Sequence, residues 1–479
     1  MKLKFKTKLS YGIGGLADNT MYTLSGTYLL FFLTTVAGIN PAIAGTITAL
    51  GSVWEAICGP IVGYCSDMVE TRFGKRKPFL LAAAFPVAIV STLLFTSIDA
   101  SQGFKIFYYT VMILLFWTSF SSFFVPYMTW GAELTDDYDE RTVLRSYAYV
   151  FNQAGMAIGM VLPTMIVDQL VGMGKSIETG WQAVGIFAGV CAGGALLICA
   201  LTNKLTDVKD FKKPENKERI LSLGQIKNMF KEYFGILKLR PIQFIIGASV
   251  AYLVANTIFS SDRVYYLSYN LGFNSNQISL TMLVITMAGI AFVPFVAYLS
   301  RKFDKKYVFA FGIGGSGIIM MAFRFIGVES MPMVIAVCLI YSIANTCYWQ
   351  LMPSIIYDVC EVEELCSGEK HSGAVISLQA LSESASMAIG FQILGIVLDL
   401  AGFNAEATVQ SAQALSWVST NFTFVPGLFM VIVVLAIMKY PLDKKLFGRV
   451  LDELKLMREG KTQEREQLLE IFGVKDKNK

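Results

Sequence analysis

The sequence has few charged residues, one histidine and no cysteine spacing typical of a disulfide or metal framework. Charged residues make up 16% of the 479 residues, against roughly 25% in a soluble domain. The single histidine, His371, lies in a polar segment, which excludes histidine-based catalysis within an apolar run. Most of the eight cysteines lie inside apolar runs, where they are predicted to be small packing residues. No nucleophile, base and orienting residue occur together in these runs, which argues against an intramembrane enzyme.

Apolar residues dominate instead. Hydrophobic residues make up 54% of the chain and the mean hydropathy is +0.54. Runs of about 20 apolar residues, long enough to cross a bilayer as a helix, recur along almost the whole sequence. The twelve predicted spans are 11–37, 42–66, 79–98, 105–132, 145–170, 181–201, 242–271, 278–300, 307–328, 332–357, 374–402 and 414–438. The sequence therefore predicts an all-α polytopic membrane protein.

Lysine and arginine alternate between rich and poor loops. They concentrate before residue 9, in the loops 66–78, 133–145, 203–240 and 301–306, and after residue 438, whereas the alternate loops hold little more than Lys105 and Lys175. By the positive-inside rule, both termini are predicted to be cytoplasmic. The net charge of +4 thus reflects orientation and gives no indication of nucleic-acid binding. The first apolar run lacks a cleavable-signal layout and is expected to remain as a helix.

The polar stretch 203–240 divides the spans into six and six. We predict a first half over 1–202, a cytoplasmic linker over 203–240 with a short surface helix near 222–238, a second half over 241–440 and a cytoplasmic tail over 441–479. The halves repeat a basic loop after their second span and an acidic run after their fourth, from Glu133 to Glu140 and from Asp358 to Glu364. Two parallel six-helix repeats are typical of transporters that work by alternating access.

Several motifs resemble one known family. They are Leu9 to Gly14 with Asp18 and Asn19, Trp54 to Gly63, Gly74 to Pro78, Pro126 with Tyr127, Glu133 to Thr142, and Tyr357 to Glu361. Over about residues 9–440 the chain resembles the glycoside-pentoside-hexuronide:cation symporters, the melibiose-permease-like branch of the major facilitator superfamily. The block from Glu133 to Thr142 is the most specific part of the resemblance.

The resemblance implies a major facilitator fold of twelve transmembrane helices in two pseudo-symmetric halves. It also implies a central substrate cavity and transport of a glycoside together with a proton or a sodium ion. The expected protein is a monomer in the inner (cytoplasmic) membrane of the cell, with no cofactor besides the coupling ion and with the lipid bilayer and a small solute as its partners.

Glu55 is the predicted coupling residue, because it lies in the middle of an apolar run and an intramembrane carboxyl is a functional-site hypothesis by default. The resemblance implies two acidic positions four residues apart in this helix, but the second is Gly59. An alkali ion requires several oxygen ligands, whereas a proton requires one carboxyl group, so proton coupling is favoured. Ser121 matches a family hydroxyl near the cation site and could help to complete a sodium site, so sodium coupling remains an alternative.

The predicted substrate residues are less polar than the resemblance implies. Phe124 replaces an aspartate that grips galactoside hydroxyls, Met128 replaces its aromatic neighbour, and Ala148 stands in place of an arginine. Substitution of this charged set argues against melibiose and favours an aryl or alkyl glycoside or a solute that is not a sugar. The candidate substrate-binding residues are Asp18, Asn19, Tyr22, Phe124, Met128, Trp349, Glu383 and Ser384.

Charged residues at the cytoplasmic ends of the helices are predicted to form ion pairs that close the inner face. Each exposed pair contributes at most about 1 kcal/mol, but several together can set a conformational equilibrium. The candidate gate residues are Asp67, Arg72, Lys75, Glu133, Asp137, Arg141, Arg145, Arg301 and Asp358.

Two other functions remain open at this point. A translocase of an amphiphile or lysolipid is possible because the predicted cavity has few polar groups, and some eukaryotic relatives of this family move lysolipids. A membrane sensor that transports nothing is disfavoured by the lack of an appended soluble domain. The tail from Leu442 to Lys479 is predicted to be one amphipathic helix with residues of both charges and no functional motif.

Overall fold

The computed structural model describes the chain apart from residues 1–2, 70, 72, 135–137, 203–234, 369–371, 405–406, 408, 460 and 475–479. The side chains at 64, 67–68, 132–133, 138–143, 145–146, 301 and 372–373 are also outside the description. Most of the predicted linker, nearly all of its short helix and His371 therefore lie outside the described residues.

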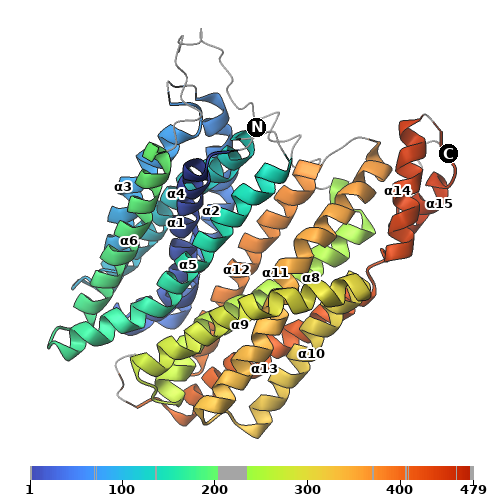
Figure 1. Ribbon diagram of the computed structural model, residues 1–479. Coiled ribbons are helices and arrows are strands. Elements are labelled where there is room, and N and C mark those ends of the chain that lie inside the picture. The colour runs from blue at the N-terminus through green and yellow to red at the C-terminus, as the bar shows by residue number, and fades with distance from the viewer. Residues whose placement is uncertain are drawn as a thin grey trace. The chain divides into compact units, whose positions relative to one another are not determined.

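The N-terminal half consists of six long helices, shown from blue to green in Figure 1. They are α1 (Phe5–Phe31) with the π-helical turn η1 (Phe32–Val36), α2 (Pro41–Met68), α3 (Lys77–Leu94), α4 (Gln102–Glu133), α5 (Tyr138–Gly172) and α6 (Ile177–Thr202). The start of α2 is defined locally, because the Asn40 side chain accepts hydrogen bonds from the backbone N–H groups of Ala42 and Ile43 while Pro41 takes the first helical position.

The C-terminal half repeats this arrangement. It contains α8 (Arg240–Tyr265) with the π-helical turn η2 (Tyr266–Asn270), α9 (Ser275–Lys302), α10 (Lys305–Ile326), α11 (Met331–Ser367), α12 (Ser372–Leu400) and α13 (Ala412–Met438). Two shorter helices follow, α14 (Lys444–Arg458) and α15 (Arg465–Phe472), which run side by side in Figure 1. The π-helical turns end the first long helix of each half, which is a structural sign of the internal repeat.

Eleven helices in the described part of the chain are long and apolar enough to cross a membrane. The remaining long helix, α1, has 27 residues and is the twelfth. It packs against α5 and α6 and buries most of its side chains inside the bundle, so its lower apolar content is expected for a helix shielded from lipid. The predicted count of twelve helices in two halves is therefore confirmed.

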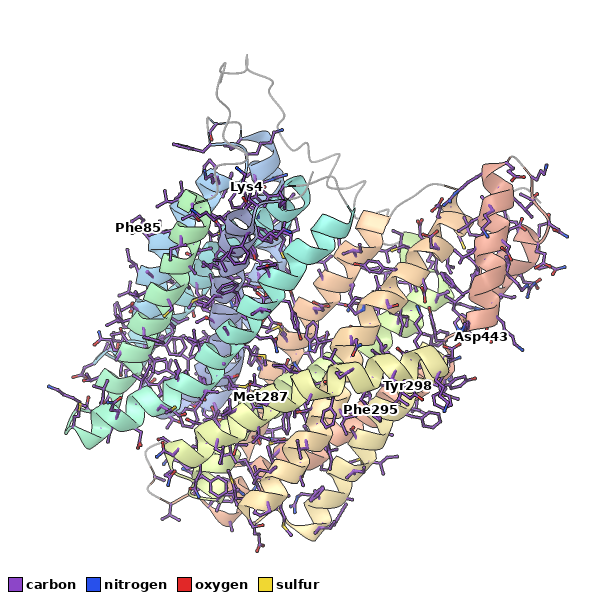
Figure 2. All side chains as sticks on the ribbon, viewed as in Figure 1. Lys4, Phe85, Met287, Phe295, Tyr298 and Asp443 are labelled. Atoms are coloured by element: carbon purple, nitrogen blue, oxygen red, sulfur yellow. The ribbon has the colours of Figure 1, made fainter. Side chains whose placement is uncertain are left out.

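The outer surface of the bundle is apolar, as a membrane protein requires. Large side chains such as Phe85 of α3 and Met287, Phe295 and Tyr298 of α9 are exposed, and Figure 2 shows them on the helices that carry them. Exposed apolar side chains spread over long helices are explained by contact with lipid.

Glycine permits a close helix contact between α1 and α5. A Cβ atom at Gly155 would lie 2.5 Å from the backbone oxygen of Leu16, and one at Gly159 would lie 2.7 Å from that of Thr20. Backbone atoms cannot move aside as a side chain can, so both positions require glycine for this packing. The contact fixes α1, which carries Asp18 and Asn19, against α5.

The helices group into two compact units that cut across the two halves. The first unit combines the N-terminal half with Ser260–Thr286 and Ala388–Ser419, which are one end each of α8, α9, α12 and α13. The second unit contains Met287–Met387, Thr420–Lys479 and the rest of α8. Four C-terminal helices therefore have one end packed on the N-terminal half.

Several helices are longer than the predicted spans because a helix can continue beyond the bilayer. Glu133 is the last residue of α4 and Glu140 lies in the first turn of α5, where a loop was predicted. Likewise α11 continues through Glu361 and Glu364 to Ser367. The prediction of one helix in the tail is wrong, because α14 ends at Arg458 and α15 begins at Arg465. The carboxylate of buried Glu453 accepts hydrogen bonds from the backbone N–H groups of Gln463 and Glu464, immediately before α15.

Candidate functional site

Glu55 lies on α2 where that helix packs against α4. Trp54 donates a hydrogen bond from Nε1 to the hydroxyl of Thr118 at 2.9 Å, and Cys58 lies 3.8 Å from the same hydroxyl. These contacts fix the register of the two helices and put Glu55 at the level of Thr118. Its side chain is half-buried and lies within the apolar span Pro41–Gly63, so the carboxyl is at membrane depth but is not sealed in the core.

At the position of the second family carboxyl, the nearest described neighbour is apolar. Among the described residues, a Cβ atom at Gly59 would come nearest to the Cγ2 of Val125, at 3.9 Å. Ser121, one helical turn before Val125, is 2% exposed. This part of α2 and α4 thus offers one carboxyl where the family pattern has two. In the described chain no group of three or more histidine, cysteine or acidic side chains could hold a metal ion.

One of the candidate substrate residues of α1, Tyr22, lies beside aromatic residues of α4. Asp18, Asn19 and Tyr22 are half-buried, and the Tyr22 ring lies edge-on to Trp117, with 6.4 Å between the ring centroids. The ring centroid of Phe120 is 6.5 Å from that of Tyr22. The rings of Tyr11 and Tyr127 are stacked with 4.7 Å between their centroids. This pair joins the start of α1 to the end of α4.

The substituted positions of α4 continue this aromatic surface. Phe124 stacks on Phe120 with 5.2 Å between the ring centroids, and Met128 is exposed. Ala148 on α5 is buried. The structure therefore brings Tyr22, Phe120 and Phe124 together, and their role in binding substrate stays a prediction.

The remaining candidates belong to the second unit. Trp349 of α11 is 43% exposed and meets the Tyr348 ring edge-on at 5.3 Å. Ser384 of α12 is buried and Glu383 beside it is half-buried. Glu383 Oε1 accepts a hydrogen bond of 3.2 Å from Gln379 Nε2, one turn earlier on the same helix.

The sequence analysis missed a buried polar network attached to Glu383. Gln379 Nε2 also lies 2.7 Å from Ser249 Oγ of α8 and 3.2 Å from the hydroxyl of Tyr348 of α11. Those two hydroxyl oxygens are 2.5 Å apart. The only sequence signal was the spacing of four between Gln379 and Glu383, which puts both on one helix face.

A close backbone contact joins α2 to α12 within the first unit. A Cβ atom at Gly45 would lie 2.8 Å from the backbone oxygen of Phe391, and one at Gly395 would lie 2.6 Å from that of Pro41. Asn40, at the start of α2, donates a hydrogen bond to the carboxylate of Asp399 near the end of α12. The two helices can pack this closely only because both crossing positions are glycine.

The π-helical turns lie in the same packed region. The hydroxyl of Thr34 in η1 is 2.6 Å from the hydroxyl of Tyr265, and Phe31 meets the Tyr265 ring at 5.2 Å. Phe403 packs edge-on against Tyr265 and Tyr269. Asp262 and Arg263 on α8 are completely buried, so this charged dipeptide is not at an exposed interface. We call this region, from Phe31 to Gly45 and from Tyr265 to Tyr269 with Gly395 to Phe403, the packed end.

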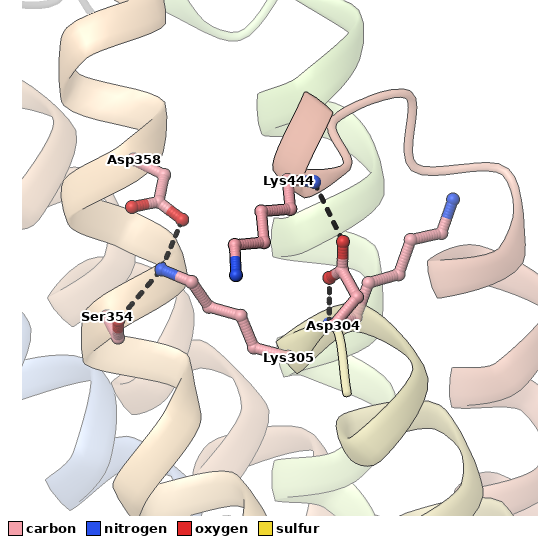
Figure 3. Close-up of polar contacts among 6 residues, drawn as sticks. Asp304, Lys305, Ser354, Asp358 and Lys444 are labelled. Atoms are coloured by element: carbon pink, nitrogen blue, oxygen red, sulfur yellow. Dashed lines mark hydrogen bonds and ion pairs between the residues drawn. The ribbon is translucent and has the colours of Figure 1, made fainter. Parts of the chain in front are cut away.

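Asp358 is a candidate gate residue whose ion pair the structure describes. Its carboxylate pairs with Lys305 Nζ at 2.5 Å, and the same ammonium group donates to Ser354 Oγ at 3.0 Å, as Figure 3 shows. The expected set did not include Lys305. The side chain of Lys75 is described and makes contacts. The other gate candidates have no described side chain: Asp67, Arg72, Glu133, Asp137, Arg141, Arg145 and Arg301.

Arg76 was also missed. It is 5% exposed and donates a hydrogen bond of 2.5 Å to Ser66 Oγ, across the loop between α2 and α3. Lys77 next to it is 3% exposed. The basic loop in which the sequence analysis placed the gate candidates Arg72 and Lys75 therefore has two basic side chains, Arg76 and Lys77, that are buried in the protein.

The tail helices dock on the end of the C-terminal half. Arg458 of α14 pairs with Glu364 of α11 at 3.0 Å. The Asp304 carboxylate accepts from the backbone N–H of Lys444 at 2.7 Å (Figure 3). Burial, followed by the nearby carboxyls of Asp358 and Asp304, raises the pKa of the Tyr440 phenol. The tail is thus an integral part of this end of the second unit.

Comparison with known proteins gives one matching family. Its model, described as MFS/sugar transport protein, matches residues 10–444. A glucuronide carrier protein homolog of Escherichia coli (strain K12) is 26% identical, over 95% of this chain and 96% of its own. A putative glycoside/cation symporter of the same organism is 25% identical, over 89% of each chain.

A vertebrate relative is named for a different substrate. The sphingosine-1-phosphate transporter of Xenopus tropicalis is 25% identical, over 92% of this chain and 89% of its own. Among solved structures, a bacterial homologue of the human drug peptide transporters has a TM-score of 0.65 and covers 95% of this chain and 99% of its own, at 12% identity. That likeness concerns the fold alone.

Proposed function

The chain belongs to the MFS/sugar transport protein family, and from this premise we propose that it is a secondary active transporter that carries a glycoside together with a cation by alternating access. It is a multi-pass membrane transporter of this family and not an enzyme. The observation that carries the proposal is Glu55, a single half-buried carboxyl inside an apolar span, in a chain similar to a glycoside/cation symporter.

We propose the proton as the coupling ion. The contact surface of α2 and α4 supplies Glu55, whereas at the second family position, Gly59, the described residue nearest to a Cβ atom is the apolar Val125. A carboxyl group can bind a proton without further ligands, whereas a sodium ion would need oxygens from elsewhere. Ser121, buried on α4, is the residue through which a sodium site could still be completed.

In the proposed cycle, a proton neutralises Glu55 and a solute binds beside the aromatic surface of Tyr22, Phe120 and Phe124. Aromatic faces favour the apolar side of a sugar ring, while Asp18 and Asn19 can accept hydrogen bonds from its hydroxyls. Only the empty carrier or the carrier loaded with both proton and solute changes conformation, so the proton gradient drives the solute.

The orientation follows from the basic loops. We propose that both termini are cytoplasmic and that the protein acts as a monomer in the inner membrane of the cell. Accordingly, Lys305, Asp358 and the tail helices belong to the cytoplasmic side, and the packed end belongs to the outer side.

A second candidate function is translocation of an amphiphile, because a relative of similar identity is named for sphingosine-1-phosphate and because Phe124 replaces a family aspartate. Counterflow separates the two candidates. Proteoliposomes preloaded with alkyl and aryl glycosides, glucuronides, pentosides or a lysolipid are diluted into the same compound in labelled form.

We expect a glycoside to exchange at least about tenfold faster through the protein than through protein-free liposomes, and the lysolipid not to compete. Exchange of the lysolipid alone would reject the glycoside and favour the amphiphile. A free monosaccharide without an aglycone serves as the control for the expected preference for a partly apolar solute.

A further inference from the structure

A carboxyl in the C-terminal half has no part in the proposed cycle. Glu383 lies within the apolar span Ala374–Leu400 and is half-buried. Among the described residues its hydrogen-bond partner is the neutral amide of Gln379. A carboxylate in such surroundings is costly without a cationic partner, whereas a protonated carboxyl is not. Glu383 is therefore expected to bind a proton when its surroundings are dry and to release it when water reaches the carboxyl.

The groups around Glu383 are neutral on every helix that contributes to the network. Gln379 comes from α12 itself, Ser249 from α8 and Tyr348 from α11. The phenol of Tyr252 stacks on that of Tyr348, with 4.2 Å between the ring centroids. The titratable groups that the described contacts join to this network are Tyr348 and, stacked on it, Tyr252, and both phenols are neutral over the physiological range. Glu383 is the one member that can change charge.

The hydrogen bonds of the Gln379 amide depend on whether Glu383 is protonated. Its Nε2 has two hydrogens and three acceptors within 3.2 Å, while its Oε1 is buried without a hydrogen-bond partner in the described structure. With a carboxylate at 383, the amide donates to it. With a carboxylic acid at 383, an amide turned over by 180° accepts from it instead. A proton on Glu383 therefore changes which hydrogen bonds reach Ser249 and Tyr348.

We propose that Glu383 is a second proton-binding site, in the C-terminal half, and that Gln379 links its protonation to the packing of α8, α11 and α12. This inference rests on the proposed transport function for its role in the cycle. The carrier then moves two protons with each solute, one at Glu55 and one at Glu383. Protonation of Glu383 changes the hydrogen bonds of a neutral network within the C-terminal half.

Infrared difference spectra test the site without any substrate. The purified full-length protein is taken through a change of pH, and the carbonyl band of a protonated carboxyl is followed. We expect this band in the wild type to lose one component in Glu383→Gln, and we expect that component to shift in frequency in Gln379→Leu, which lacks the amide. The exposed Glu178 of α6 gives the matched control Glu178→Gln, whose spectrum should equal that of the wild type in the same region.

Proton movement during solute uptake tests the role. In weakly buffered proteoliposomes, Glu383→Gln should lower the number of protons taken up per transported solute by about one relative to the wild type. A wild-type proton ratio together with an unchanged infrared band in Glu383→Gln would overturn the proposal. If no glycoside is transported at all, the proposed function fails, and the infrared bands still decide whether Glu383 binds a proton.

Discussion

Gly395→Ala and Gly45→Ala should each lower the counterflow rate by about 10-fold to 100-fold without unfolding the protein. The added methyl group would lie 2.6 Å or 2.8 Å from a backbone oxygen on the opposite helix, closer than atoms approach without something moving. Because the obstacle is backbone, α2 and α12 must separate. Overpacking of this kind costs about 1–3 kcal/mol, and each 1.4 kcal/mol changes an equilibrium tenfold.

The loss has a specific cause in an alternating-access cycle. The packed end holds α2 and α12 together, and a transporter of this fold must both form and break such contacts in each turnover. A variant that cannot form the contact stays in conformations in which this end is open. Hydrogen exchange of the segments 32–40 and 395–404 should therefore become faster in both variants than in the wild type.

Gly194→Ala is the matched control. It is the same substitution in a long helix, α6, but its Cβ atom would meet nothing within 4 Å, and alanine is a better helix former than glycine by about 1 kcal/mol. Counterflow and hydrogen exchange at the packed end should equal those of the wild type. Wild-type rates in Gly45→Ala and Gly395→Ala would show that the contact of α2 with α12 is not required for turnover.

Glu55→Gln should abolish accumulation driven by a gradient while counterflow falls by no more than a few-fold. Glutamine keeps the shape of the side chain and fixes it in a neutral state, so the variant changes conformation with or without solute, whether or not Glu383 carries a proton. Solute then equilibrates across the membrane. The accumulation ratio should fall to about one, because coupling requires that a carrier loaded with solute alone or with a proton alone does not change conformation.

Two comparisons keep this prediction specific. Glu178→Gln makes the same chemical change at an exposed position of α6 and should accumulate solute as the wild type does. Glu383→Gln should still accumulate solute, to a lower level set by one proton fewer. Full accumulation by Glu55→Gln would assign coupling to another group.

The sequence predicts the fold well because its signals are local. Twenty-residue apolar runs, basic loops and the polar stretch at 203–240 define the membrane-spanning helices and the two halves. For these helices, the predicted boundaries differ from the structure at the helix ends. Residues such as Glu133, Glu140 and Glu364 are charged, so hydropathy assigns them to loops, whereas backbone hydrogen bonds continue the helices into water. The break between α14 and α15 depends on the buried carboxylate of Glu453, which hydropathy does not report.

The site was predictable only in part. Glu55 and Glu383 stand out because a carboxyl inside an apolar run is conspicuous from sequence alone. Ser249 and Tyr348 do not, because a hydroxyl in an apolar run is common and the contact with Gln379 joins three distant helices. The glycine contact of Gly45 with Gly395 is equally invisible, since the chain has 40 glycines and only the crossing of α2 and α12 distinguishes these two.

Solute accumulation in proteoliposomes under an imposed proton gradient tests the central claim most directly. With a glycoside identified by counterflow, the wild type should raise the internal concentration well above the external one when the inside is made alkaline and electrically negative. The accumulation should vanish when a protonophore removes the gradient. Entry that stops at equal concentrations with the gradient intact would contradict proton-coupled symport and leave a carrier that only equilibrates its solute.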